Sequence, residues 1–344
     1  MRLFVTGGAG FIGSHFIDHW LSHHPSDHVV TLDLLTYAGS RARLAGAEET
    51  GRCRFIQGDI CDAATLREAL RDSELLVHFA AETHVDRSIT DAAPFLRTNV
   101  EGTYTLLREA QAQGIQRVMH ISTDEVYGPI LDGAVDEKAP LSPRSPYAAS
   151  KAAGDLLVQA FRETHDLPAI VVRPTNIFGP GQFPEKFIPL CIINSFDGLP
   201  LPVYGDGRQR RAWLYVSDLC GALEVILRRG RAGDTYNVAG RTEQPNLETA
   251  KMVLNATGGS SELIQFVADR PGHDRRYAMS DAKLRALGWT PRITFERGLS
   301  QTIAWYREHA EWWRPLTTRL REDPYHWLNR SARASAGSAA CSAR

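Results

Sequence analysis

The sequence predicts an α/β protein with a Rossmann-like, doubly wound parallel sheet and a smaller α/β region after it. Two observations lead to this fold class. From residue 2 to about 175, short apolar segments alternate with helical patterns, as strands and helices do in a doubly wound sheet. A glycine-rich turn over residues 7–13 follows the first apolar segment and leads into the first helical pattern.

The apolar segments are predicted to be strands buried on both faces of a sheet. Each is short, apolar throughout and rich in β-branched residues. These segments are residues 2–6, 28–33, 53–58, 75–80, 117–122 and 169–173. Helices are predicted near residues 12–24, 64–71, 95–113 and 147–164.

The sequence changes character after Pro174. Prolines and glycines are frequent between residues 179 and 207, and an aromatic helix is predicted at about 296–313. We therefore predict a Rossmann domain over residues 1–175, to which later segments return. Residues 176–330 are predicted to bind mainly the substrate, and the small, polar residues 331–344 are predicted to be a disordered tail.

Charge and hydropathy exclude several classes of partner. The net charge of -1 gives no overall basic field, so neither nucleic acid nor an anionic membrane surface is expected as a partner. The chain has no uncharged apolar run long enough to span a membrane, and its first residues enter a strand without a signal-peptide pattern.

The cysteines and histidines also narrow the function. The five cysteines are scattered and form no CxxC pair, which indicates reduced thiols and a cytoplasmic location. His19, His23, His24 and His28 have no carboxylate or cysteine partner at ligand spacing, so no metal site is predicted.

The glycine-rich turn predicts a dinucleotide site. Glycine at positions 7, 10 and 13 permits a tight turn, close approach to a pyrophosphate and close helix packing. Asp33 lies 20 positions beyond Gly13, where a carboxylate accepts hydrogen bonds from the adenosine ribose. That carboxylate repels a 2′-phosphate and favours NAD over NADP, although Arg41 and Arg43 nearby leave the preference open.

Asp59 follows the third predicted strand and has two interpretations. Its carboxylate would contact the adenine edge, or it would cap the N-terminus of the next helix. The predicted cofactor set is completed by Phe11, Ile12, Ile60 and Ala80.

A second group of residues predicts proton transfer. Ser145 caps a predicted helix and Pro146 fits its first turn, so Tyr147 and Lys151 lie on one face of that helix. A phenol has a pKa of about 10 in water. The ammonium group and the helix dipole are expected to favour the phenolate, which makes Tyr147 a base for a hydroxyl proton.

Two adjacent carboxylates, Asp124 and Glu125, follow the strand predicted at residues 117–122. Charged groups at the end of a core strand reduce stability unless they are paired or used. Together with Thr123 they are therefore candidates for the chemical site.

These motifs resemble the extended short-chain dehydrogenase/reductase family in its sugar-nucleotide-modifying branch. The resemblance covers residues 1 to about 313 and rests on segments 7–13, 78–82, 98–103, 122–128 and 147–151. More narrowly, the chain resembles the dTDP-glucose 4,6-dehydratases. That match rests on segments 33–39, 81–88, 183–189, 213–216 and 270–277.

The resemblance implies a reaction and residue roles. NAD oxidises C4 of a nucleoside-diphosphate hexose, dTDP-glucose being favoured, with Tyr147 and Lys151 taking the hydroxyl proton and Thr123 orienting the ketone. Glu125 then removes the C5 proton, Asp124 protonates the departing 6-hydroxyl, and the hydride returns to C6 to give a 4-keto-6-deoxy sugar. Decarboxylases carry serine at the position of Asp124, and 4-epimerases need no acid there. A UDP-sugar 4-epimerase, a decarboxylase and a non-catalytic NAD-binding regulator are the alternatives.

The resemblance also implies substrate contacts and a homodimer. The predicted contacts are His84, Asp86, Asn176, Glu185, Lys186, Arg211, Asn237, Arg270 and His273. The helices near 95–113 and 147–164 form the dimer interface in this superfamily. Ile177, Phe178 and Ala212 depart from the pattern of the dehydratases, which leaves the pocket shape and the nucleotide open.

Overall fold

The computed structural model describes residues 1–322. The predicted tail at 331–344, and the end of the predicted substrate region, lie outside the described residues. Among residues 1–322, no helix combines the length and the apolar character needed to cross a membrane.

The main sheet has seven strands in the order β10-β6-β5-β4-β1-β2-β3. Every neighbouring pair in it is parallel, so the predicted fold class is confirmed. The six predicted strands are β1 (Arg2–Thr6), β2 (His28–Asp33), β3 (Cys53–Gln57), β4 (Leu75–His78), β5 (Arg117–Ile121) and β6 (Ala169–Pro174). The seventh, β10 (Thr235–Val238), comes from the later part of the chain and pairs with β6.

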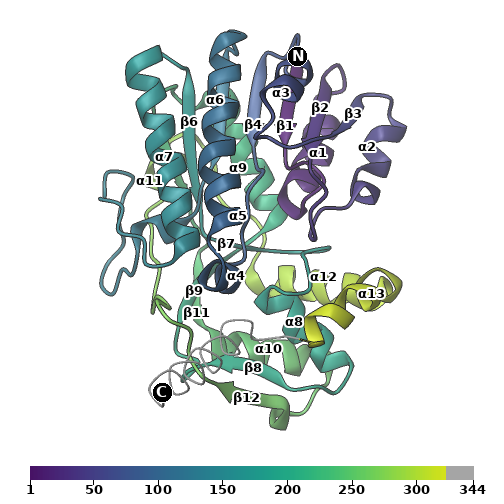
Figure 1. Cartoon of the computed structure of the whole chain (residues 1–344). Coiled ribbons are helices and arrows are strands. Elements are labelled where there is room, and N and C mark those ends of the chain that lie inside the picture. The colour runs from purple at the N-terminus through teal and green to yellow at the C-terminus, as the bar shows by residue number, and fades with distance from the viewer. Residues whose placement is uncertain (323–344) are drawn as a thin grey trace, which may run out of the picture.

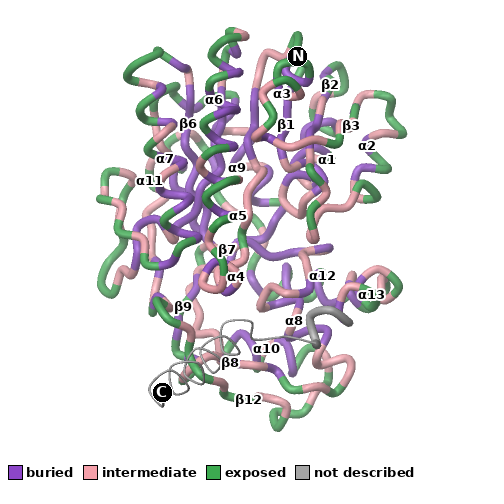
Figure 2. Tube along the Cα trace, viewed as in Figure 1, coloured by how far each residue is buried: buried purple, intermediate pink, exposed green. Residues whose placement is uncertain are grey.

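Helices cover both faces of this sheet (Figure 1). On one face α1 (Phe11–His23) and α9 (Val216–Arg229) bury apolar side chains against the strands, for example Trp20 and Leu223. The other face carries α3 (Ala63–Ala69), α6 (Thr103–Ala112) and α7 (Pro146–His165). The shorter elements nearby are η1 (Arg41–Leu44), α2 (Ala45–Glu49), α4 (Val85–Thr90), η3 (Asp124–Tyr127) and α11 (Ala282–Ala286). Figure 2 shows the resulting buried layer between the two sets of helices.

The helix predicted at 95–113 is one continuous helical stretch with a change in winding. It begins as α5 (Ala93–Leu96), passes through the π-helical segment η2 (Arg97–Gly102) and continues as α6. A π-helical turn inside a helix often marks a functional site. Here the turn presents Thr98 to the large cavity described below.

The single helix predicted at 296–313 is wrong. The structure has two helices, α12 (Phe295–Glu308) and α13 (Ala310–Glu322), separated at His309. His309 leaves the helical conformation, with φ -117° and ψ 43°. Its ring stacks on Trp305 at a centroid distance of 4.3 Å, and this contact stabilises the turn that the aromatic pattern did not reveal.

The smaller region lies beyond the carboxyl ends of the parallel strands (Figure 1). It contains two small sheets, β11-β9-β7 and β12-β8, which are flanked by helices. Its core is aromatic, with Phe178, Trp213, Phe295, Tyr306 and Trp313 in one cluster. Its elements are β7 (Asn176–Phe178), α8 (Phe187–Phe196), β8 (Leu201–Tyr204), β9 (Arg210–Tyr215), β11 (Thr242–Pro245), α10 (Asn246–Thr257), η4 (Ser261–Leu263) and β12 (Ile264–Val267), followed by α12 and α13.

Candidate active site

One large cavity lies between the carboxyl edge of the main sheet and the smaller region. In open parallel sheets, ligands bind at this edge. The predicted cofactor residues all line the cavity, and so do the five predicted catalytic residues. They are Gly7, Gly10, Phe11, Ile12, Gly13, Asp33, Asp59, Ile60, Ala80, Thr123, Asp124, Glu125, Tyr147 and Lys151.

The glycine turn lines one end of the cavity, and the backbone is packed so closely there that only glycine fits. Gly7 has φ +73°, and a Cβ atom on it would lie 2.6 Å from the backbone nitrogen of Ala80. A Cβ atom on Gly13 would lie 2.3 Å from the carbonyl oxygen of Gly7. The start of α1 therefore lies directly against the turn, which leaves a backbone-lined cradle of the kind that accepts a pyrophosphate.

Asp33 is held at the end of β2 by backbone amides. Its Oδ2 accepts a hydrogen bond from the Ala9 N–H at 3.0 Å, and its Oδ1 accepts one from the Leu35 N–H at 2.8 Å. Burial raises the pKa of Asp33, and the two amide hydrogen bonds act in the opposite direction. The carboxylate is thereby fixed beside the glycine turn.

The arginines near Asp33 have other partners. Arg41 pairs with Glu48 at 2.9 Å, and Arg43 donates to the carbonyl oxygen of Gly181 while its guanidinium lies over the ring of Trp312. Both guanidinium groups are therefore engaged with other residues, and neither interaction indicates binding of a 2′-phosphate beside Asp33.

Asp59 is not a helix cap. The N-cap of α3 is Asp62, whose side chain accepts from the Ala64 and Thr65 amides, so the capping interpretation of Asp59 is wrong. Asp59 instead accepts from the Cys61 N–H at 2.8 Å and pairs with Arg97 at 2.6 Å, at the wall of the cavity.

The predicted start of α7 is confirmed. Ser145 is the N-cap and accepts from the Ala148 N–H, and Pro146 occupies the first turn. Tyr147 and Lys151 both reach the cavity from this helix.

The expected lowering of the pKa of Tyr147 is not found, and that prediction is wrong for the side chains as they stand. Burial raises the pKa of Tyr147, as does the negative charge of Glu125, while a hydrogen bond with Thr123 lowers it. Lys151 does not point at the phenol, because its Nζ donates to the carbonyl oxygen of Ile121 at 2.7 Å. Burial lowers the pKa of Lys151 to about 8.

Asp124 is a buried carboxyl group enclosed by two threonines. Thr123 donates to its Oδ1 at 3.2 Å and Thr175 donates to its Oδ2 at 3.3 Å. Burial raises the pKa of Asp124 to about 7, the neighbouring Glu125 adds to the rise, and Arg211 opposes it. Near neutral pH, a substantial fraction of Asp124 therefore carries a proton that it can donate.

Glu125 belongs to a different set of neighbours. Tyr277 donates to its Oε2 at 3.4 Å and donates to Asp274 at 2.9 Å. Burial raises the pKa of Glu125, and the positive charges of Arg270 and Arg211 lower it. The two carboxylates thus line one cavity but have separate partners, Asp124 among hydroxyl groups and Glu125 beside a phenol and two arginines.

Three of the predicted substrate residues line the cavity directly: Asn176, Glu185 and Lys186. The Asn176 Oδ1 atom is buried and has no hydrogen-bond partner among the described residues. A buried carbonyl oxygen without a partner is costly, which is consistent with a ligand donor at this point. Glu185 accepts from the Tyr37 hydroxyl at 2.8 Å and Lys186 donates to the Thr83 carbonyl oxygen at 3.1 Å.

Five further predicted residues do not line the cavity themselves. Ion pairs and hydrogen bonds link them to one another or to residues that line it. Arg270 pairs with Asp86 at 2.9 Å, and Arg211 donates to His273 at 3.0 Å. His84 caps α4 and lies 3.8 Å from Glu185. Burial lowers the pKa of His84 to about 4, so the ring is neutral at neutral pH.

Asn237 does not line this cavity, and its role as a nucleotide contact stays a prediction. The residue is 0% exposed on β10, where its Oδ1 accepts from Tyr127 at 2.8 Å and its Nδ2 donates to Ser280 at 3.3 Å. The resemblance named Asn237, but it could not show that both polar side-chain atoms have partners inside the protein.

The three departures from the family pattern have different surroundings. Phe178 packs in the aromatic core of the smaller region, whereas Ile177 lines the cavity. Ala212 contributes its carbonyl oxygen, which accepts from Thr175 at 2.7 Å. Only Ile177 therefore changes the cavity wall directly.

Sequence reasoning missed two residues at the site. Thr175 follows β6 at the carboxyl edge of the sheet, a position that favours ligand contact in this fold. Tyr277 ends the matched segment 270–277, yet nothing in the sequence indicated that its hydroxyl would reach Glu125.

Comparison with known proteins agrees with this geometry. The family model described as GDP-mannose 4,6 dehydratase matches residues 4–302. The chain belongs to this family. Its resemblance to dTDP-glucose 4,6-dehydratases is confirmed by a Streptomyces niveus enzyme of that name, which is 49% identical over 92% of the chain and 96% of the relative.

One further relative and one solved structure are also similar to the chain. The low-salt glycan biosynthesis protein Agl12 of Haloferax volcanii is 52% identical over 89% of the chain and 98% of its own length. The crystal structure of DesIV, a dTDP-glucose 4,6-dehydratase from Streptomyces venezuelae solved with NAD bound, has a TM-score of 0.90 and 48% identity. The aligned residues cover 92% of the chain and 100% of DesIV.

Proposed function

We propose that this protein is an NAD-dependent dTDP-glucose 4,6-dehydratase, which converts dTDP-glucose to dTDP-4-keto-6-deoxy-glucose. The observation that carries the proposal is the joint presence of Asp124, Glu125 and Tyr147 in the cavity that the glycine turn closes. Oxidation alone requires one base, whereas elimination of water requires an additional acid and base. The dehydratases to which the chain is similar support the nucleotide and the sugar.

The cavity fits NAD. The cradle at Gly7 and Gly13 has no room for a side chain, and Asp33 lies beside it with its carboxylate held by two backbone amides. When bound, NAD would accept the hydride from C4 of the sugar and return it to C6. The residues proposed to hold it are Gly7, Gly10, Phe11, Ile12, Gly13, Asp33, Asp59, Ile60, Ala80, Tyr147 and Lys151.

The protein's own groups move the protons. Tyr147, in its phenolate form, takes the proton of the 4-hydroxyl group while Thr123 orients the same oxygen. The hydrogen bond with Thr123 opposes the rise in the phenol pKa that burial causes. The resulting ketone acidifies the C5 hydrogen.

The surroundings of the two carboxylates support the order of acid and base. Burial raises the pKa of Glu125, but two arginines oppose that rise, so Glu125 is assigned the removal of the C5 proton. Asp124 is the group that retains a proton near neutrality and is assigned its transfer to the departing 6-hydroxyl group. Environments that separate the pKa values of two neighbouring groups favour one acting as acid and the other as base.

Substrate binding is proposed to use the residues around these groups. Asn176 offers an unpaired carbonyl oxygen to a ligand donor. Arg211 and Arg270 supply positive charge for the diphosphate, since guanidinium groups bind phosphate oxygens in a bidentate manner. His84, Asp86, Glu185, Lys186 and His273 are proposed to complete the site.

Two further properties belong to the proposal. Leu96, Tyr104 and Leu156 are large apolar residues that are exposed on one face, by 55%, 44% and 57% respectively. We propose that two copies associate through this face to form a homodimer.

The cysteines at 53, 61, 191 and 220 are free thiols, which supports a cytoplasmic location for the enzyme.

Isotope transfer tests the function. Purified protein is incubated with dTDP-glucose that carries deuterium at C4, and the product is analysed by NMR and mass spectrometry. Deuterium at C6 of a 4-keto-6-deoxy product is expected, because one bound cofactor removes and returns the hydride. Label retained at C4 without a keto sugar would exclude the dehydratase, and a change of configuration at C4 would indicate a 4-epimerase. UDP-glucose under the same conditions tests the choice of nucleotide.

The turnover is expected to decrease as pH rises through about 7. The pKa of Asp124 is raised to about 7, so the proton-donating form predominates below that pH and is lost above it. The measurement is kcat for dehydration between pH 5.5 and 9 at saturating substrate. The Asp124→Asn variant should lose this decline, whereas a wild-type kcat that increases above pH 7 would contradict the assignment.

Asp33→Asn is expected to weaken NAD binding about 10- to 100-fold, since hydrogen bonds to a charged group contribute about 1.5–3 kcal/mol. The same change removes the charge that repels a 2′-phosphate, so the preference for NAD over NADP should narrow. Calorimetric titration of cofactor-free protein with both nucleotides measures this. Asp132→Asn, an exposed aspartate outside the cavity, serves as the control. An unchanged ratio of the two affinities would contradict the role of Asp33.

A further inference from the structure

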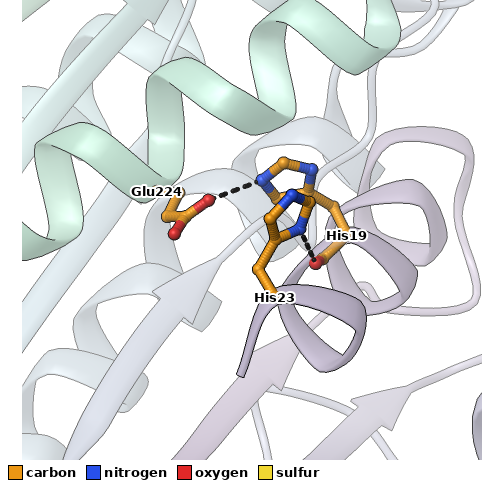
Figure 3. A group of neighbouring side chains, drawn as sticks. All are labelled: His19, His23 and Glu224. Carbon is orange, nitrogen blue, oxygen red and sulfur yellow. Dashed lines mark hydrogen bonds and ion pairs between the residues drawn. The ribbon is translucent and has the colours of Figure 1, made fainter. Parts of the chain in front are cut away.

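A cluster of histidines at the end of α1 lies next to a carboxylate from α9 (Figure 3). His23 lies in the last turn of α1, His19 lies one turn before it and His24 is the C-cap, whereas Glu224 belongs to α9. The α-helix rises about 1.5 Å per residue, so this cluster lies about 12–18 Å along α1 from the glycine turn. The cluster is therefore separate from the proposed active site.

The distances bring potential metal ligands together. The Nε2 atom of His19 lies 2.8 Å from Oε2 of Glu224. One ligand atom each from His19, His23 and Glu224 lies within 4.8 Å of the other two. In a tetrahedral zinc site with bonds of about 2.0–2.1 Å, ligand atoms are about 3.3 Å apart, so small side-chain rotations would complete the geometry.

The hydrogen bonds around the cluster hold the imidazoles and the carboxylate in place. His23 uses its Nδ1 to donate to the carbonyl oxygen of His19 at 2.8 Å, which leaves its Nε2 as a lone-pair donor (Figure 3). Histidine ligands of metals characteristically make such a bond with the second ring nitrogen. His24 contacts the other carboxylate oxygen, Oε1 of Glu224, at 2.9 Å.

We propose that His19, His23 and Glu224 bind a divalent transition-metal ion of the zinc type, and that His24 positions the carboxylate. Imidazole nitrogens with one carboxylate oxygen are a ligand set that zinc, cobalt and nickel accept. The negative end of the α1 dipole adds a favourable field for a cation in the last turn. The sequence predicted no metal site because Glu224 is 201 positions away from His23, and only the packing of α9 beside α1 supplies it.

Positive charges near the cluster oppose the ion. Arg52 donates to the carbonyl oxygens of Leu21 and His24 at the end of α1, at 3.0 and 3.2 Å. Arg228 lies 3.8 Å from Oε1 of Glu224, but its side chain is 57% exposed and approaches the oxygen that faces away from His19. Binding also displaces the proton shared between His19 and Glu224, so the ion would release protons on binding. Neither effect blocks the Oε2 side of the carboxylate, where His19 lies.

The position of the site indicates a structural role. The ion would join α1, from the start of the chain, to α9, which follows β9 of the smaller region and returns to the same face of the main sheet. A ligand that binds only the folded state raises its stability in proportion to the logarithm of its concentration. We therefore expect metal to raise the melting temperature without a requirement for it in turnover.

The test uses the full chain without an affinity tag, after treatment with EDTA. Zn²⁺ is titrated in competition with a chromogenic chelator, and Co²⁺ is added separately to record its visible absorption. One equivalent of Zn²⁺ per chain is expected, with a tetrahedral Co²⁺ spectrum and a rise in melting temperature of about 2 °C or more at saturation.

Matched variants separate this site from adventitious binding by surface histidines. His23→Gln and Glu224→Gln should abolish the stoichiometric site and the Co²⁺ spectrum, and His24→Gln should weaken Zn²⁺ binding about 10- to 100-fold. His165→Gln, an exposed histidine at the end of α7, should behave as the wild type. Circular dichroism and NAD binding report whether each variant is folded.

The proposal is overturned if folded His23→Gln and Glu224→Gln bind Zn²⁺ with the wild-type affinity and stoichiometry. It is also overturned if wild-type protein binds no more Zn²⁺ than folded His23→Gln, or if His165→Gln abolishes the stoichiometric site. Because His23 is exposed and Glu224→Gln retains the shape of the side chain, at least one variant is expected to fold. Neither readout depends on the dehydratase activity.

Discussion

Tyr147→Phe is expected to lower the turnover of dTDP-glucose about 10²- to 10⁴-fold, the range that a positioned general base contributes. The substitution removes the hydroxyl group that takes the C4 proton, and the first step of the reaction depends on that transfer. The phenyl ring keeps the buried packing against Phe95, whose ring centroid lies 6.3 Å away. The loss should therefore appear in kcat rather than in binding of NAD or substrate.

Steady-state kinetics with dTDP-glucose measures the effect, and NAD titration checks that the cofactor site is intact. Tyr104→Phe is the matched control, because it removes a phenol from an exposed position on α6. Tyr147 also shares a hydrogen bond with Thr123, so a loss of stability of about 1 kcal/mol is compatible with the proposal. A turnover within tenfold of wild type would remove Tyr147 from the role of base.

The second large effect concerns Glu125 and Asp124. Glu125→Gln is expected to lower dehydration about 10²- to 10⁴-fold, because the amide cannot remove the C5 proton. Asp124→Asn is expected to reduce dehydration by a similar factor for a different reason, since the amide is a poor proton donor to the departing hydroxyl. The two substitutions are therefore expected to impair the two proton transfers of one elimination, at C5 and at the departing 6-hydroxyl group.

Isotope exchange at C5 distinguishes these two roles. In D₂O, Asp124→Asn should retain exchange of the C5 hydrogen with solvent without loss of water, because the base is intact. Glu125→Gln should show no exchange at C5. If Glu125→Gln exchanges the hydrogen and Asp124→Asn does not, the acid and base assignments are reversed. If both variants dehydrate at the wild-type rate, neither carboxylate is catalytic.

The separate surroundings of the two carboxylates are consistent with the opposite roles proposed for them. The chain turns sharply after β5 into the short helix η3, so alternation along a strand does not decide their directions. Thr123 caps this helix and donates to Asp124, while Glu125 extends toward Tyr277. The sequence predicted that two adjacent carboxylates follow the strand, and the structure showed which side chains each of them contacts.

Local patterns were sufficient for the fold and for most of the cavity wall. The spacing of Gly7, Gly13 and Asp33 depends on backbone geometry within one β-α-β unit, which is encoded over about 30 residues. The same holds for Tyr147 and Lys151, which are one helical turn apart on α7. Contacts of this kind are determined by residues close together in the sequence.

Other properties depended on residues far apart in the chain. Burial decided the direction of the pKa shift of Tyr147, and Asn237 forms hydrogen bonds with Tyr127 and Ser280, which are distant from it in the sequence. Glu224 completed the histidine cluster on α1 only because two helices separated by some 200 positions pack on one face of the sheet.

The sequence by itself therefore determined the parallel sheet, the dinucleotide turn, and the two carboxylates and the phenol that are proposed to carry out the dehydration. Each of these follows from short-range spacing and from the periodicity of strands and helices. Only the tertiary structure decided which side chains are free to meet a ligand and which charges are shielded from water. Desolvation and long-range pairing act through neighbours that the order of residues does not reveal.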